Sequence, residues 1–169
     1  RIEDISKIDK IKWIRILYCY PDHITEELLQ EIKNNPKVVK YFDIPLQHVD
    51  GEILKQMNRT GNMKSIAALL HKIRSIIPEA VIRTTFILGF PGESGAQFET
   101  LCQFVEDHKF ERLGYFTYSQ EENTKAAQLP DQIDYEIKTA REQTLMDIQS
   151  IIIDKFSASL VGKTFEVLI

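Results

Sequence analysis

Cysteine is scarce in this sequence, which contains only Cys19 and Cys102 among its 169 residues. The two cysteines lie far apart, so they offer neither a disulfide framework nor the close spacing of a metal-binding motif. The four histidines lie on different expected elements and form no metal-spaced pair. The sequence therefore predicts no metal site of its own, and the lack of a disulfide framework favours a reducing compartment, the cytoplasm.

Long apolar runs and an excess of positive charge are also absent. No run approaches the roughly 18–20 apolar residues of a membrane span. The net charge of −4 argues against a dominant nucleic-acid role, because phosphate binding requires a basic face. The hydrophobic content of 43% and the charged content of 27% are typical of a globular protein, and a chain of this length can form one domain with a sizeable core.

The two ends of the chain suggest that it is incomplete. It begins with Arg1, and residues 2–10 resemble the tail of a helix. It ends at Ile169, in the middle of an apolar alternation. We therefore expect the chain to be a fragment of a longer polypeptide.

Apolar, β-rich runs recur along the chain at intervals of roughly 30–40 residues, and an amphipathic helical pattern follows each of them. Thr25 is predicted to cap the first such helix, which Pro36 ends, and Pro45 is predicted to stop the second strand. The expected strands are residues 13–18, 38–44, 80–88, 113–118 and the beginning of one more over 163–169. The later helices are expected over residues 52–58, 64–77, 95–108 and 135–159.

Crossovers of this length indicate parallel strands, because an antiparallel hairpin needs only a few residues between its strands. Parallel sheets are buried on both faces, which agrees with the nearly continuous apolar runs. Four strand–helix units are too few to close an eight-stranded barrel. We therefore predict an α/β fold that forms a partial, open β/α barrel, with an open doubly wound sheet as the alternative.

In either architecture the ligand site lies at the carboxyl ends of the strands. Polar and aromatic residues gather at these four ends, whereas the strand starts carry mainly apolar or basic residues. This pattern predicts a site for a polar ligand there. The strand ends are residues 18–23, 45–48, 89–93 and 118–122.

Two features of these strands allow a purely structural interpretation as well. Residues 89–92 (Gly-Phe-Pro-Gly) form either a tight turn or a place where a ligand approaches the backbone closely. Arg83 lies inside an apolar strand, and a buried guanidinium needs a partner. That partner is either Asp43 or Glu93, or the carboxylate of a ligand.

Four motifs occur in a fixed order along the chain: residues 16–21 (ILYCYP), 41–48 (YFDIPLQH), 57–59 (MNR) and 83–93 (RTTFILGFPGE). With these motifs, the chain resembles the radical S-adenosylmethionine (SAM) methylthiotransferases over nearly its whole length. The resemblance implies that residues 1–160 form the later part of a radical SAM β/α barrel. It further implies that residues 161–169 begin the TRAM-like β domain that ends these enzymes.

The resemblance also implies SAM and two 4Fe–4S clusters as cofactors. In the family, a cluster held by a CxxxCxxC motif binds SAM and cleaves it to a 5′-deoxyadenosyl radical, and a second cluster supplies the inserted sulfur. This sequence contains no CxxxCxxC motif. Because thiolates hold such clusters, we expect the chain alone to bind no cluster and to be inactive.

The resemblance assigns several strand-end residues to SAM binding. Gln47 would meet the ribose or the amino-acid part of SAM, and residues 87–93 would lie along the adenine. Arg83 and Thr85 share strand parity, so both are expected to face the barrel interior and orient the cofactor. The predicted cofactor-binding residues are Gln47, His48, Arg83, Thr85, Ile87, Gly89, Phe90, Pro91 and Tyr118, and no catalytic residue is assigned.

Two motifs point to the branch that modifies an aspartate of small-subunit ribosomal protein twelve. They are residues 18–21 and residues 116–124, where the tRNA-modifying branch would carry an arginine near Glu122. Asn123 departs from the pattern, because a glycine would be usual there. The implied partner is the ribosomal protein, with RNA contact only through the rest of the TRAM domain and no membrane contact. Two alternatives stay open: the tRNA-adenosine methylthiotransferase branch, and an inert α/β scaffold or interaction module.

Overall fold

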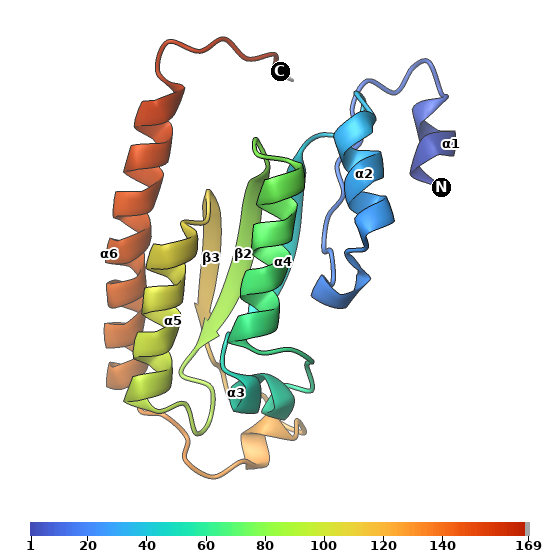
Figure 1. Ribbon diagram of the computed structural model, residues 1–169. Coiled ribbons are helices and arrows are strands. Elements are labelled where there is room, and N and C mark those ends of the chain that lie inside the picture. The colour runs from blue at the N-terminus through green and yellow to red at the C-terminus, as the bar shows by residue number, and fades with distance from the viewer. Residues whose placement is uncertain (168–169) are drawn as a thin grey trace.

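A parallel sheet of three strands, with helices between them, forms the centre of the computed structural model, which describes residues 1–167 (Figure 1). The strand order is β1-β2-β3, and both neighbouring pairs are parallel. The strands are β1 (Tyr41–Gln47), β2 (Val81–Leu88) and β3 (Arg112–Thr117). The predicted α/β fold with an open set of parallel strands is therefore confirmed.

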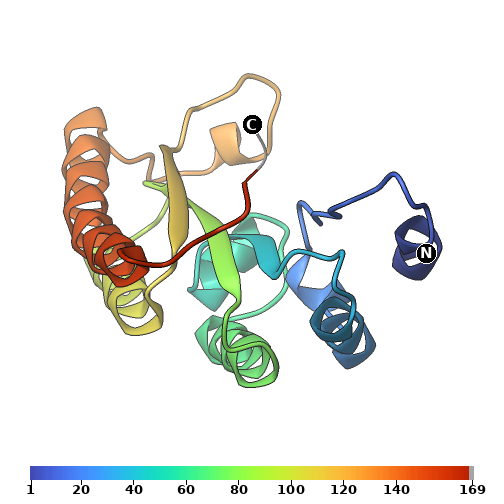
Figure 2. The same ribbon diagram turned by 90° about the horizontal axis from the view of Figure 1, so that it is seen from above.

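The helices cover one side of this sheet. Seen from above, α4, α5 and α6 lie on that side, whereas the other side bears the loop between β3 and α6 and the segment after α6 (Figure 2). We call the side of the sheet opposite α4, α5 and α6 the open face. The helices are α1 (Ile2–Ser6), α2 (Glu26–Asn34), α3 (Gly51–Gln56), α4 (Met63–Ile76), α5 (Gly95–His108) and α6 (Tyr135–Leu160), with 3₁₀ turns at Pro21–His23 and Ala126–Gln128.

Side-chain caps fix where the helices begin. The Thr25 hydroxyl accepts a hydrogen bond from the Leu28 amide at 3.2 Å, which confirms the predicted N-cap. Ser94 and Gln97 form a capping box at the start of α5, which matches its predicted range of 95–108. These local signals explain why the helix boundaries follow the sequence closely.

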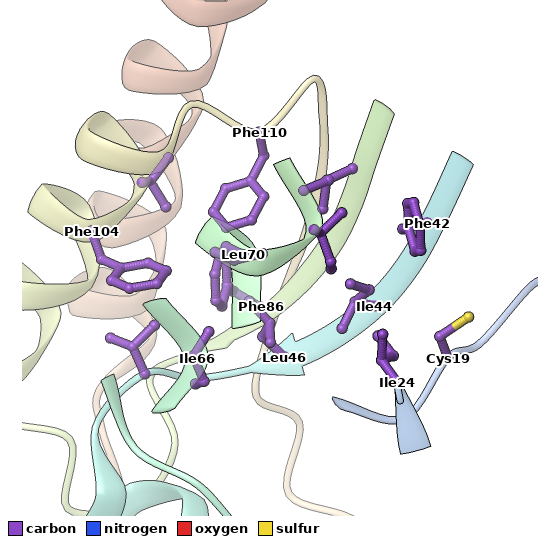
Figure 3. Packing of buried hydrophobic residues seen from close by; sticks show 14 of the residues in the cluster. Cys19, Ile24, Phe42, Ile44, Leu46, Ile66, Leu70, Phe86, Phe104 and Phe110 are labelled. Carbon is purple, nitrogen blue, oxygen red and sulfur yellow. The ribbon is translucent and has the colours of Figure 1, made fainter. Parts of the chain in front are cut away.

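The core lies between the sheet and its helices. Phe86 of β2 is fully buried and meets the ring of Phe110 edge-on, with centroids 6.0 Å apart. Phe104 of α5 lies close to both (Figure 3). Phe42 and Ile44 of β1 continue the same cluster. The core therefore fixes the positions of the three strands, whose other face is the open one.

Helix α6 is the longest element, and it packs along β3 and α5. Its buried residues, Arg141, Leu145 and Gln149, lie four apart, so they share one face. The Gln149 side chain donates a hydrogen bond to the Phe110 carbonyl at 3.0 Å. Among residues 1–167, neither α6 nor any other helix has both the length and the apolar character needed to cross a membrane.

The predicted strand over residues 13–18 is wrong. This segment runs beside β1 but pairs with the chain only at an isolated bridge between Ile14 and Val38. Leu17 and Tyr18 are exposed, and Tyr18 has a φ of 56°, which ends the extended conformation. The apolar run resembled a buried strand, but it lacks the consecutive hydrogen bonds of a ladder.

Pro45 does not stop the second strand, as the sequence predicted, but lies inside β1. Between Ile44 and Gln47 the register with β2 shifts. Proline has no amide hydrogen to give to a ladder, and such irregularities are where strands tolerate it. β1 therefore extends to Gln47, with its start displaced to Tyr41.

The strand expected over residues 163–169 is not formed in the part that the structure describes. Residues 163–167 have no strand pairing, and residues 168–169 lie outside the described residues. The TRAM-like domain therefore stays a prediction.

Stability is expected to fall at mildly acidic pH because of His108, at the end of α5. Burial lowers the pKa of His108 below its ordinary value of 6.5, and the nearby Arg74 lowers it further. The unfolded chain then binds the proton more readily than the folded chain. This part of the stability is present above pH 6.5 and is lost as the pH falls through the lowered pKa.

Urea unfolding at a series of pH values measures this effect. In a His108→Gln variant, the free energy of unfolding should no longer show the fall below pH 6.5 that His108 causes. A wild-type curve that coincides with that of the variant would contradict the prediction.

Candidate functional site

A pocket of about 600 Å³ opens along β2 and at the ends of β1 and β3. Arg83, Thr85 and Ile87 alternate along β2, so their side chains share its open face. Gln47 closes the end of β1, and Tyr118 follows β3. Five of the nine predicted cofactor-binding residues therefore line one pocket, although they come from three separate strands.

The other four predicted residues lie outside this lining. His48 is fully buried, and Gly89, Phe90 and Pro91 form a buried turn beyond the end of β2. The ring of Phe90 meets the ring of Tyr118 edge-on, with centroids 5.4 Å apart. This turn therefore packs against Tyr118 on the side away from the pocket.

The segment after β2 is a tight turn. Gly89 and Gly92 have φ values of 68° and 80°, and the Glu93 amide donates to the Phe90 carbonyl at 2.9 Å. Positive φ is the region that favours glycine, which explains both positions. Asn123, which stands where the family has glycine, has a φ of 65° and so takes a glycine-like conformation.

Of the partners that the sequence left open for Arg83, which were Asp43, Glu93 and a ligand carboxylate, the structure shows Asp43. The two side chains form an ion pair with a nitrogen–oxygen distance of 2.8 Å across neighbouring strands. The hydrogen bond to Asp43 raises the pKa of the guanidinium. However, the Arg83 side chain is 37% exposed, so the expectation that it is buried is wrong. Its remaining donors face the pocket that it lines.

Six residues of the pocket were absent from the predicted set, and Arg59 and Tyr18 are two of them. Arg59 donates to the Pro45 carbonyl at 3.3 Å, and its guanidinium lies 5.4 Å from the centre of the Tyr20 ring. Tyr18 is 76% exposed at the pocket rim. The motif of residues 57–59 singled out Arg59 in the sequence. Its local pattern does not predict that the loop after α3 returns to the end of β1.

The pocket is positively charged overall. Arg59 and Arg83 line it, and none of the described residues in the lining is acidic. Asp43 neutralises one of the two arginines, so one positive charge remains. Apolar and aromatic surface from Ile87 and Tyr118 lies beside these charges. Such a lining suits a ligand that carries both a flat apolar ring and an anionic group.

The two cysteines do not fit an iron–sulfur cluster. Cys19 is buried beside β1, and its amide donates to the Asp43 carbonyl. Cys102 lies on α5, where burial raises the pKa of its thiol to about 11. Within residues 1–167 no group of three metal-ligating side chains comes together. Cluster binding needs several thiolates, which these two separated cysteines do not supply.

We expect anaerobic incubation with iron and sulfide to leave this chain without a cluster. Two separated thiols, both with raised pKa values, cannot provide the thiolates that a cluster requires. The measurement is visible absorbance after gel filtration, with a Cys19→Ser/Cys102→Ser variant as the background. Absorbance that survives gel filtration in the wild type alone would contradict the prediction.

Comparison with known families places most of this chain in one group. The profile of the Radical SAM superfamily matches residues 1–105. This range includes α1–α4, β1, β2 and most of α5. Of the five predicted residues in the pocket, four lie within it.

Curated proteins give a more specific similarity. The chain is 55% identical over 168 residues to the ribosomal protein uS12 methylthiotransferase RimO of Thermoanaerobacter sp. (strain X514), and 50% identical to RimO of Clostridioides difficile (strain 630). In both cases the alignment covers 99% of this chain and 38% of the relative. The chain thus spans well under half the length of these relatives.

Solved structures show the same fold at lower identity. The coproporphyrinogen III oxidase HemN from Escherichia coli, a radical SAM enzyme, matches with a TM-score of 0.68 and 21% identity. The match covers 83% of this chain and 32% of that one. Elp3 of Methanocaldococcus infernus matches with a TM-score of 0.52 and 15% identity. These likenesses concern the fold alone.

Proposed function

Because this chain belongs to the radical SAM superfamily, we propose that it forms one wall of the SAM pocket in a methylthiotransferase acting on ribosomal protein uS12. The observation that carries the proposal is the pocket along β2, which brings together Gln47, Arg83, Thr85, Ile87 and Tyr118. The similarity to the uS12 methylthiotransferases over 99% of the chain supports the reaction.

The residues of this pocket suit SAM. The hydroxyl of Tyr118 is buried and finds no hydrogen-bond partner among residues 1–167, and a polar ligand atom would supply one. Ile87 offers apolar cover for an adenine ring, and Gln47 can both donate to and accept from ribose hydroxyls. Arg59 can hold a carboxylate, because its guanidinium donates in a fork that matches two oxygens.

The chain's own contribution is to bind and orient the cofactor. When bound beside a reduced cluster, SAM is the source of the radical that opens an unreactive carbon–hydrogen bond. The two 4Fe–4S clusters would be held outside this chain, since its cysteines do not fit them. The open face of the sheet would then be closed by the rest of the enzyme, which keeps water from the reactive species.

We infer that the substrate is an aspartate of the small-subunit ribosomal protein, and that the enzyme works in the cytoplasm. The relatives at 55% and 50% identity are named for ribosomal protein uS12. Residues 161–169 would begin a TRAM-like domain, through which any RNA contact would run. The tRNA-adenosine branch is the second candidate enzyme function. An inert α/β scaffold is the third candidate, and it is not an enzyme.

A chimeric enzyme tests these candidates. The segment of the Clostridioides difficile relative that aligns with this chain is replaced by this chain, and the purified chimera is reconstituted with clusters. We expect methylthio transfer to uS12 and none to tRNA, measured by mass spectrometry of both substrates. Modification of tRNA would favour the sister branch, and a chimera that holds its clusters but does not cleave SAM would favour the scaffold.

A further inference from the structure

Three ionisable side chains that do not line the pocket meet behind its wall. His48 and Glu93 are fully buried, and the Arg141 side chain is only 10% exposed. They come from the end of β1, the turn after β2 and the second turn of α6. Buried groups of this kind are costly unless they satisfy one another, so their convergence requires an explanation.

Glu93 is the centre of this cluster. Its Oε2 accepts a hydrogen bond from the Gly89 amide and lies 3.2 Å from Nη1 of Arg141. Arg141 also donates through Nη2 to the Glu93 carbonyl at 3.1 Å. The side chain of Glu93 thus closes its own turn onto Gly89, and Arg141 fixes that turn to α6.

His48 faces the other oxygen of the carboxylate. Its Nδ1 accepts a hydrogen bond from the Asp50 amide at 3.0 Å, so the ring proton lies on Nε2. Nε2 is 3.7 Å from Oε1 of Glu93. This distance is longer than a hydrogen bond, and neither atom has a hydrogen-bond partner among the described residues. Glu93 therefore presents one oxygen to the Gly89 and Arg141 donors and the other to the His48 ring.

The turn that Glu93 holds packs against Tyr118, a residue of the pocket lining. It begins at Gly89 and bears Phe90, whose ring meets that of Tyr118 edge-on. Helix α6 fixes Tyr118 as well, because Nζ of Lys138 donates to the Tyr118 carbonyl at 2.9 Å. Tyr118 lines the pocket, so the position of this ring depends on the turn behind it.

We propose that Glu93 is a positioning residue: its carboxylate fixes the turn of residues 89–93 between His48 and Arg141, and through Phe90 it holds Tyr118 at the pocket wall. The identity of the pocket's ligand as SAM rests on the proposed function. The positioning of Tyr118 by Glu93 does not depend on that function.

Glu93→Gln is the direct test. A glutamine must turn its NH₂ group toward either the Gly89 and Arg141 donors or the His48 Nε2 proton, because an amide accepts on one side only. We expect the Gly89 amide proton to move upfield in the NMR spectrum, its hydrogen exchange to accelerate, and the Tyr118 ring resonances to shift. Binding of S-adenosylhomocysteine, used as an unreactive probe, should weaken roughly tenfold.

The chain offers a matched control at the opposite end of the sheet. Glu111 accepts from the Ile82 amide at 2.8 Å and pairs with Arg74 at 3.1 Å, so it combines a β2 amide and an arginine as Glu93 combines the Gly89 amide and Arg141. Glu111→Gln should change stability but leave the Tyr118 resonances and the probe affinity as in the wild type. Should Glu93→Gln fail to fold, Arg141→Lys is measured instead, because a single ammonium cannot replace both Nη1 at the Glu93 carboxylate and Nη2 at the Glu93 backbone carbonyl.

The outcomes separate the two proposals. Unchanged Gly89 and Tyr118 resonances in Glu93→Gln, or equal changes in Glu111→Gln, would overturn the positioning role. A wild type that does not bind S-adenosylhomocysteine would count against the proposed function, and the resonances alone would then decide the role of Glu93.

Discussion

Replacing Arg141 by methionine is expected to lower the free energy of unfolding by about 3–5 kcal/mol, the range for removing one partner of a buried ion pair. Arg141 is the cation that pairs with the fully buried Glu93 behind the pocket. Methionine fills a similar volume but leaves the carboxylate without its charge partner. The effect is therefore one of an uncompensated charge rather than of a cavity. Urea unfolding followed by circular dichroism measures it.

Two further variants separate this cause from a general loss of packing. Adding Glu93→Gln to Arg141→Met removes the stranded charge, so the double variant should recover about 1 kcal/mol or more. Arg74→Met breaks a pair in which both side chains are partly exposed, and it should cost less. A double variant less stable than Arg141→Met would contradict this explanation.

Replacing Gly89 by alanine should cost about 2–4 kcal/mol, as the sum of backbone strain and a steric clash. Gly89 has a φ of 68°, where an L side chain is strained. An added Cβ would also lie 2.5 Å from Cγ of Lys138, closer than real Cβ contacts. Because Lys138 holds the Tyr118 carbonyl, the clash should disturb the pocket wall too.

Gly162 provides the matched control for the strain alone. It has a φ of 83°, but a Cβ there would meet no atom within 4 Å. Gly162→Ala is therefore expected to cost only about 1–2 kcal/mol. The clash is isolated by combining Gly89→Ala with Lys138→Ala, which removes the conflicting Cγ. Equal losses for Gly89→Ala and Gly162→Ala would show that the clash contributes nothing.

Local sequence signals were enough to predict most of the fold. The capping box of Ser94 and Gln97 and the hydrophobic periodicity of α5 are encoded within a few residues, and the predicted range of that helix is correct. The strand predicted over residues 13–18 was wrong because strand formation is not decided locally. Its apolar composition is that of a strand, but strand formation depends on hydrogen bonds to distant residues, and Tyr18 takes a positive φ that composition does not reveal.

The candidate site was predictable where strand geometry decides it. Arg83, Thr85 and Ile87 follow from alternation along a single strand, and all three line the pocket. No local rule tells whether the His48 side chain, just after β1, points into the pocket or away from it. Its partner Glu93 is 45 residues away in the chain, and Arg141 is 48 residues beyond Glu93. Only the three-dimensional fold brings these groups together.

Helix α6 holds two loops at once, and this restricts how the chain can change in length. Lys138 and Arg141 are three residues apart, so they lie on the same face of the helix, one holding the loop after β3 and the other the turn after β2. One residue inserted between them would rotate one anchor by about 100° relative to the other, so they could no longer act together. Insertions in the loop before α6 carry no such penalty. Length variation among related chains should therefore fall before Tyr135 and avoid the first two turns of the helix.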